Sequence, residues 1–186
     1  MSAELNSENI KQVVANWLNE VVIGLNLCPF ASKPYKNQQI DIVVSDCINE
    51  ACLLEQLQQE LERLENTATD NLETTLLVVP KMLHDFFDYN QFLDYVDDLI
   101  TQQGWTGTFQ VANFHPDYQF AGTSPEDAEN LTNRSPYPIL HLLRENSLEK
   151  ALQRYPNPEQ IPDNNIKTVT LLSKVEKLKL FAFLTK

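Results

Sequence analysis

The sequence is poor in glycine and lacks the glycine-rich motifs that cradle phosphates. Only 4 of its 186 residues are glycine, and it contains neither a Gly-x-Gly-x-x-Gly fingerprint nor a P-loop. The Gly-x-Ser-x-Gly elbow of many hydrolases and the His-Glu-x-x-His motif of zinc proteases are also missing. These absences argue against the common nucleotide-binding and hydrolase classes.

Long apolar runs are lacking too. The longest, Val21 to Leu27, is interrupted by Gly24 and Asn26, whereas about 20 apolar residues are needed to cross a bilayer. The first residues, Met1 to Glu4, lack the basic start and apolar stretch of a signal peptide. Three cysteines, an odd number, do not predict a disulfide framework. We therefore expect a cytoplasmic protein with no membrane partner.

Clusters of basic residues are missing as well. The sequence has 14 Lys and Arg against 26 Asp and Glu, which gives a net charge of −12. Residues 41–100 hold fourteen of these acids and only two bases, Arg63 and Lys81. Nucleic-acid binding needs a basic face, so we expect no nucleic-acid partner. The acidic stretch is interpreted as solvated helix faces, with a docking surface for a basic partner as the alternative.

Apolar spacing predicts alternating helices and strands. The expected helices run from Ile10 to about Gly24, from Ser45 or Asp46 to Leu64, from Tyr89 to a cap at Gly104, and from Asn146 to Tyr155. Residues 166–180 suit either a helix or a strand, and we favour a helix. In this interpretation Cys47 and Cys52 lie on the second helix as packing residues. The expected strands are 40–44, 76–79, 108–114 and 139–143.

This alternation indicates an α/β fold, with 1–186 as a single domain around a four-stranded, largely parallel sheet. The alternative is a two-layer α+β sandwich with a mixed sheet. Residues 115–137 form a loop that is too long to be a simple connection, which predicts a packed, functional loop. A proline-rich connector, 156–165, leads to the C-terminal segment.

Ligands of open α/β sheets bind beyond the carboxyl ends of the strands. In a parallel sheet these ends present Lys81 and His84, then His115 and Asp117, then Arg144. His115 and Asp117 flank Pro116, and a carboxylate that accepts the ring N–H would make His115 a general base or a metal ligand. The alternative is a loop-capping histidine.

Two prolines stiffen the segment Asn133 to Pro138, which contains Arg134 and Tyr137. An arginine on an extended segment suits capture of a carboxylate or phosphate, whereas a salt bridge to Asp127 or Glu129 is the alternative. Arg144 is a second candidate anchor. His141 alternates with aliphatic residues and is interpreted first as a core residue.

Cys28 lies where the first helix must stop before Pro29. The negative end of the helix dipole opposes thiolate formation there, so Cys28 is a nucleophile only if a histidine or arginine approaches. The sequence contains no Cys-x-x-Cys pair, so we do not expect a thiolate zinc site.

Three blocks of the sequence carry a family resemblance: Gly24 to Ala31 (GLNLCPFA), Phe114 to Gly122 (FHPDYQFAG) and Asn133 to Glu145 (NRSPYPILHLLRE). With a weaker block at Ile161 to Thr168, the chain resembles the bacterial family known as domain of unknown function (DUF) 1415. The resemblance implies no activity. It implies only that six candidate residues lie in signature blocks, namely Cys28, His115, Asp117, Arg134, His141 and Arg144.

Three functions remain open at this point. The first is a small-molecule enzyme for an anionic substrate, in which His115 and Asp117 move a proton, Cys28 is an optional nucleophile, and an anchoring set holds the substrate. That set comprises Asn133, Arg134, Tyr137, His141 and Arg144. The second is a non-catalytic module that binds a metabolite or a protein. The third is a single metal bound by His115, Asp117 and His141, with Cys28 as an optional further ligand. No cofactor and no oligomeric state follow from the sequence.

Overall fold

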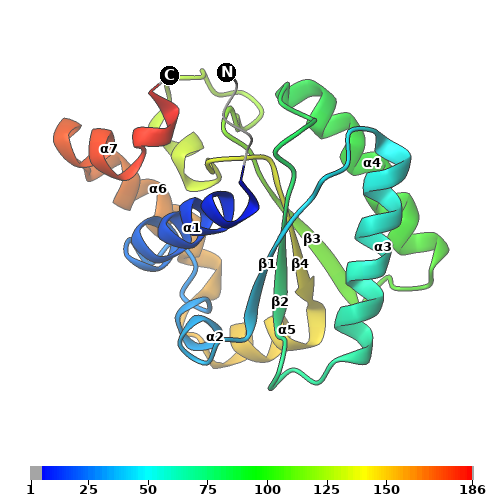
Figure 1. The fold of residues 1–186 in the computed structure, drawn as a ribbon. Coiled ribbons are helices and arrows are strands. Elements are labelled where there is room, and N and C mark those ends of the chain that lie inside the picture. The colour runs from blue at the N-terminus through cyan, green and yellow to red at the C-terminus, as the bar shows by residue number, and fades with distance from the viewer. Residues whose placement is uncertain (1–5, 186) are drawn as a thin grey trace.

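The computed structural model describes residues 6–185, in which helices cover both faces of a four-stranded sheet (Figure 1). The strands are β1 (Ile40–Val44), β2 (Thr74–Val78), β3 (Phe109–Phe114) and β4 (Ile139–Arg144). Their order across the sheet is β1-β2-β4-β3. The expected strands are confirmed to within two residues at either end.

The expected parallel arrangement is wrong for most of the sheet. Only β1 and β2 pair in parallel, and β4 runs antiparallel to both β2 and β3. A parallel crossover usually needs a helix, and the 115–137 segment contains only a short turn, η2 (Ala128–Thr132), so the chain folds back beside β3. The mixed sheet of the alternative is confirmed, although helices cover two faces instead of one.

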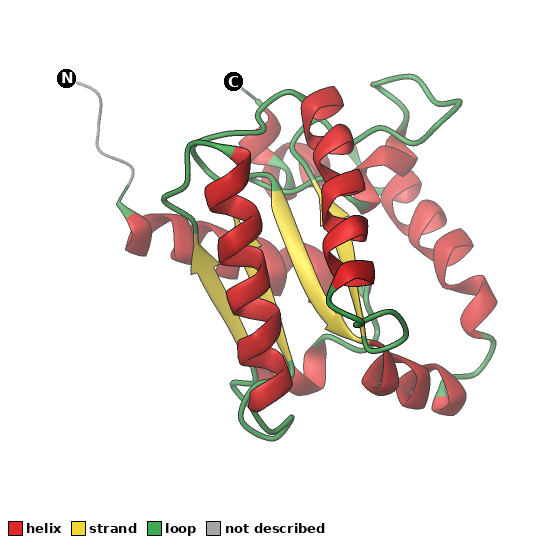
Figure 2. Cartoon of the chain, turned by 90° about the vertical axis from the view of Figure 1, so that its right-hand side faces the viewer, coloured by secondary structure: helices red, strands yellow, loops and turns green. Residues whose placement is uncertain are grey.

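Two long helices, α3 (Glu50–Asn66) and α4 (Phe86–Gln102), cover one face, as seen from the front in Figure 2. Helix α3 begins later than the expected Ser45 or Asp46, because the Asn49 side chain caps it by accepting from the Cys52 N–H. Ser45 instead extends the sheet by donating to the Val78 carbonyl. Gly104 follows α4 with a φ of 73°, the left-handed conformation expected of a helix-ending glycine.

The opposite face carries the first helix and the C-terminal ones. Helix α1 (Ser7–Trp17) continues into the π-helical turn η1 (Leu18–Ile23), and their apolar stripe is buried as predicted. The remaining elements are α2 (Ser32–Lys36), α5 (Glu145–Arg154), η3 (Pro158–Gln160), α6 (Ile161–Leu171), α7 (Lys174–Leu180) and η4 (Ala182–Leu184). The tail is thus helical, as expected.

The proline-rich connector is shorter than predicted, because α6 already begins at Ile161. Pro162 falls in the first turn of α6, where a missing backbone N–H costs no hydrogen bond. No helix within residues 6–185 is long and apolar enough to cross a membrane.

Exposed acidic side chains concentrate on one face of the molecule. The outer surfaces of α3 and α4 carry eight exposed acids: Glu50, Glu55, Glu62, Glu65, Asp88, Asp94, Asp97 and Asp98. Across the sheet, the short helix α7 carries Lys174, Lys177 and Lys179 together with Glu176. Figure 1 shows α7 and the α3–α4 layer at opposite sides of the molecule.

Candidate functional site

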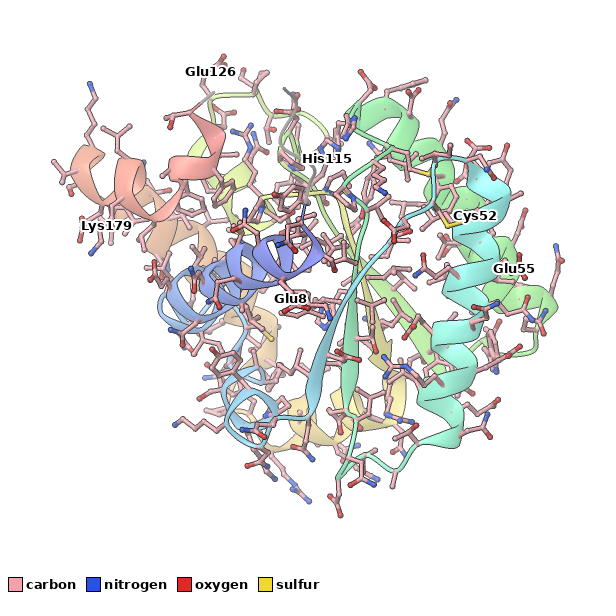
Figure 3. All side chains as sticks on the ribbon, viewed as in Figure 1. Glu8, Cys52, Glu55, His115, Glu126 and Lys179 are labelled. Atoms are coloured by element: carbon pink, nitrogen blue, oxygen red, sulfur yellow. A yellow bond between two sulfur atoms is a disulfide. The ribbon has the colours of Figure 1, made fainter. Side chains whose placement is uncertain are left out.

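The candidate site lies at the upper edge of the sheet, defined as the edge where β1, β2 and β3 end and β4 begins. Three segments meet there: 79–85 after β2, 115–118 after β3, and 133–138 before β4. Figure 3 shows His115 at this edge and Glu126 on the far end of the same loop.

His115 is fully buried and both of its ring nitrogens have partners. Its Nε2 lies 3.0 Å from the Leu83 carbonyl oxygen, and its Nδ1 accepts the backbone N–H of Asp117 at 3.0 Å. A carbonyl can only accept, so the proton of the neutral ring is on Nε2. Burial lowers the pKa of His115, against the opposing effects of the Leu83 carbonyl and the charges of Asp117 and Asp85. This ring closes a turn, and nitrogen-based proton transfer would require it to leave Leu83.

Asp117 contacts His115 through its backbone, not its carboxylate. The expected carboxylate–imidazole pair is therefore replaced by a turn in which the ring accepts from the main chain. The Asp117 side chain is exposed, so it is free to face a ligand or solvent.

Hydrogen bonds hold the 115–137 loop in place, in line with the prediction of a packed loop. Asn130 is fully buried and binds the loop at three points: its Oδ1 accepts from the Phe120 N–H and the Thr123 hydroxyl, and its Nδ2 donates to the Ser124 carbonyl. Such a satisfied buried amide fixes one loop conformation.

Arg134 lies on this loop with its guanidinium oriented by the main chain. Its Nε donates to the Tyr118 carbonyl at 3.2 Å and its Nη2 to the Pro125 carbonyl at 2.6 Å. Two of five N–H groups are thereby used, and the other three have no protein acceptor among the described residues. Burial lowers the pKa of Arg134, while the nearby charges of Asp117 and Glu126 raise it.

The alternative for Arg134 is a salt bridge to Asp127 or Glu129, and neither is present among the described residues. The acids that form salt bridges there are Asp41, Asp46 and Glu60. Behind Arg134, the indole N–H of Trp17 donates to its carbonyl at 3.0 Å. Neighbouring Asn133 donates through Nδ2 to the Asn113 carbonyl at 3.3 Å.

Arg144 lies at the opposite, lower edge of the sheet, so the expectation that it joins His115 is wrong. The reversed direction of β4 takes its end away from the ends of β1, β2 and β3. There its Nη2 donates to three carbonyls where α3 ends, those of Leu64, Thr67 and Leu72. A cation in this position satisfies and neutralises the helix terminus.

Three further predicted residues lie away from the exposed edge. His141 is on β4 between Leu76 and Ala112, and burial lowers its pKa to about 4. Tyr137 and Cys28 pack against the apolar cluster beneath α1. Burial raises the pKa of the Cys28 thiol, despite the backbone hydrogen bonds of Phe30 and Ala31, so its reactive thiolate is disfavoured at neutral pH.

The other two cysteines are bonded to each other, contrary to the expectation of two packing residues. A disulfide joins Cys47, before α3, to Cys52 in its first turn. The misplaced helix start explains the error, because Cys47 lies outside the helix and can reach back to Cys52. A free thiol remains at Cys28.

The predicted site residues do not line either of two surface hollows. One, of about 160 Å³, lies between α1 and the C-terminal residues, with Trp17, Pro136 and Lys179 in its wall. The other, of about 350 Å³, lies between β3 and α5. Within residues 6–185, no three His, Cys, Asp or Glu side chains gather as a metal ion would require.

Sequence reasoning missed Trp17 and Asn130 as residues that shape the site. Trp17 supports Arg134 from 117 positions away, which leaves no local signal. Asn130 does have one, since a buried amide often organises the turn-rich loop around it, but burial is not visible in a single sequence.

The comparisons with known proteins give one match. The model of a family described as "Protein of unknown function (DUF1415)" matches residues 9–179, nearly the whole chain. No curated protein and no solved structure matches. The resemblance carried by the three sequence blocks is thereby confirmed.

Proposed function

We propose that this chain, which belongs to the DUF1415 family, binds a small anionic metabolite at the upper edge through Arg134. The observation that carries the proposal is the guanidinium itself: two main-chain carbonyls orient it, and three of its N–H groups have no protein acceptor within residues 6–185. An oriented arginine with unused donors suits a carboxylate or phosphate oxygen pair.

The surroundings of Arg134 support a binding role over a structural one. Trp17 and Asn130 fix the segments on either side of it, so the guanidinium is held before a ligand arrives, which lowers the entropic cost of binding. Asp117 and Glu126 lie near enough to raise the pKa of Arg134, but neither is paired with it. The site is on the surface, where ion pairs contribute little, so we expect weak affinity for a simple anion.

Binding without catalysis is the better-supported version. Both nitrogens of His115 are used within the protein, and burial opposes formation of the Cys28 thiolate. The catalytic version requires His115 to release the Leu83 carbonyl when substrate binds. In our proposal the ligand is bound in the cytoplasm and involves no nucleic acid, in keeping with the net charge of −12.

An anion titration followed by amide and guanidinium NMR shifts tests the proposal. Phosphate, sulfate, citrate and acetate are compared with uncharged glycerol at constant ionic strength. We expect saturable shifts around Arg134 for at least one anion, and their loss in Arg134→Gln.

Arg154→Gln is the matched control, because Arg154 is an exposed arginine near the end of α5. It should retain the wild-type response. Equal responses in both variants, or no saturable shift for any anion, would refute binding through Arg134. Turnover of a substrate that disappears in His115→Gln, with folding intact, would instead favour the catalytic version.

A further inference from the structure

The disulfide between Cys47 and Cys52 connects the end of β1 to the start of α3, and its Cα atoms are 5.6 Å apart. We propose that this pair is a thiol–disulfide exchange site, which an external thiol opens and closes while the protein stays folded. The bond is exposed on one side, it plays a small part in holding the fold, and acidic side chains surround it.

The two sulfur-bearing residues differ in access. Cys52 is exposed, whereas Cys47 is 7 % exposed and belongs to the apolar cluster under α3. The four residues between them, 48–51, are all exposed, and Ile48 is 74 % exposed. Figure 3 shows Cys52 at the upper end of α3. An incoming thiolate can therefore reach the sulfur of Cys52 and not that of Cys47.

The fold around the bond is held by other contacts. Asn49 caps α3, Leu53 and Leu57 anchor it in the core, and Ser45 binds β2 through the Val78 carbonyl. The cysteines are only five positions apart, so the bond restricts a short loop. A domain of this size does not need such a cross-link, and opening it leaves β1 and α3 in place.

The exchange proceeds in two balanced steps. A thiolate RS⁻ attacks the Cys52 sulfur, the bond to Cys47 breaks, and Cys47 leaves as a thiolate that takes a proton from water. A second thiolate then attacks the R sulfur of the mixed disulfide, releasing RSSR and the Cys52 thiolate. In sum, two RSH become RSSR, and the protein disulfide gains two electrons and two protons.

The surroundings accommodate the opened form. Gln56 Oε1 lies 3.7 Å from the Cys47 sulfur, within reach of the thiol that reduction creates. The Cys52 sulfur would be in the first turn of a 17-residue helix, where the positive end of the helix dipole favours a thiolate. Gln56 thus stabilises Cys47 once it has taken up its proton, and the helix terminus stabilises the Cys52 thiolate released in the second step.

Charge around the pair selects the thiol. Asp46, Glu50 and Glu55 are exposed beside the cysteines, and the cation there, Lys81, is already paired with Asp46 at 2.6 Å. An anionic thiol is repelled by this surface and a cationic one is attracted. We therefore assign the exchange to thiols that are cationic, or that are carried by a partner with a basic surface.

The test uses the full chain with Cys28→Ser, so that only the pair reacts. Free thiols are counted by alkylation and intact mass after treatment with cysteamine, which is cationic, or mercaptoacetate, which is anionic, at equal thiolate concentration. We expect zero alkylated thiols before treatment and two after it, with unchanged near-ultraviolet circular dichroism, and reoxidation by cystamine.

The rate with cysteamine should exceed that with mercaptoacetate about fivefold at low salt, and the ratio should approach one at high salt. A Glu50→Gln, Glu55→Gln double variant should lower the ratio, whereas Glu126→Gln on the distant loop should not. A bond that opens only in denaturant, or a reduced pair that does not reoxidise in the folded protein, would overturn the exchange site. Equal rates for the two thiols would overturn the assignment of the partner.

Discussion

The half-buried imidazole of His141 gives a quantitative prediction about acid stability. Its ring makes no hydrogen bond to another described residue and lies 6.1 Å from the ring of Phe114. Burial lowers its pKa to about 4, whereas a histidine in an unfolded chain titrates near 6.5. The unfolded state then binds more protons between these values, so the free energy of unfolding falls as the pH falls through this window.

The linkage relation gives a loss of about 2 kcal/mol between pH 7 and pH 5 from this residue alone. Because the ring is only partly buried, solvent screening reduces our expectation to about 1–2 kcal/mol. Urea unfolding followed by tryptophan fluorescence at pH 7, 6 and 5 measures it. His141→Leu suits the alternating apolar pattern of β4 and removes the titrating group.

Wild type should lose this amount more than His141→Leu between pH 7 and pH 5. His115 also has a lowered pKa, but it is present in both proteins and cancels in the difference. Parallel pH profiles for the two proteins would show that His141 is solvated in the folded state and that our reasoning is wrong.

Three further substitutions test the packing. Arg144→Ala removes the donor to three carbonyls near the end of α3 and should lower the free energy of unfolding in urea by about 2–4 kcal/mol, against less than about 0.5 kcal/mol for the exposed Arg154→Ala. Asn130→Ala should cost about 1–3 kcal/mol and accelerate amide exchange in 115–137, without doing so in β2. Gly24→Ala brings a Cβ against the Glu20 carbonyl and should lower the thermal midpoint, by an overpacking cost of about 1–3 kcal/mol; an unchanged midpoint would contradict that contact.

Local patterns predicted most of the elements. The predicted strand 40–44 has the same bounds as β1, because four of its five residues are β-branched and favour a strand. The stop at Gly104 was also predictable, since a glycine that follows an amphipathic helix commonly takes a positive φ. These features depend on residues close together in the sequence.

Strand direction was not predictable in the same way. The alternation in 139–143 is identical whether β4 runs up or down, so the assumption of a parallel sheet placed Arg144 at the wrong edge. The absence of a helix between β3 and β4 was the usable signal, since it disfavours a parallel crossover. The carbonyls that Arg144 contacts are about 70 to 80 positions away in the sequence, so no pattern near Arg144 indicates them.

The disulfide depended on one choice of helix start. Ser45, Asp46 and Asn49 are all good N-cap residues, and the structure uses Asn49. With the earlier start, Cys47 and Cys52 would lie five positions apart on one helix and point in different directions. A shift of a few residues thus decided whether two cysteines could meet.

The eight exposed acids on α3 and α4 make that layer a concentrated patch of negative charge. On a cationic chromatography resin or electrode, the protein should adsorb with its α3–α4 layer inward. A molecule adsorbed in this orientation would hide the Cys52 sulfur against the support and display the C-terminal helices α6 and α7, so the immobilisation chemistry decides which half of the protein reagents can reach.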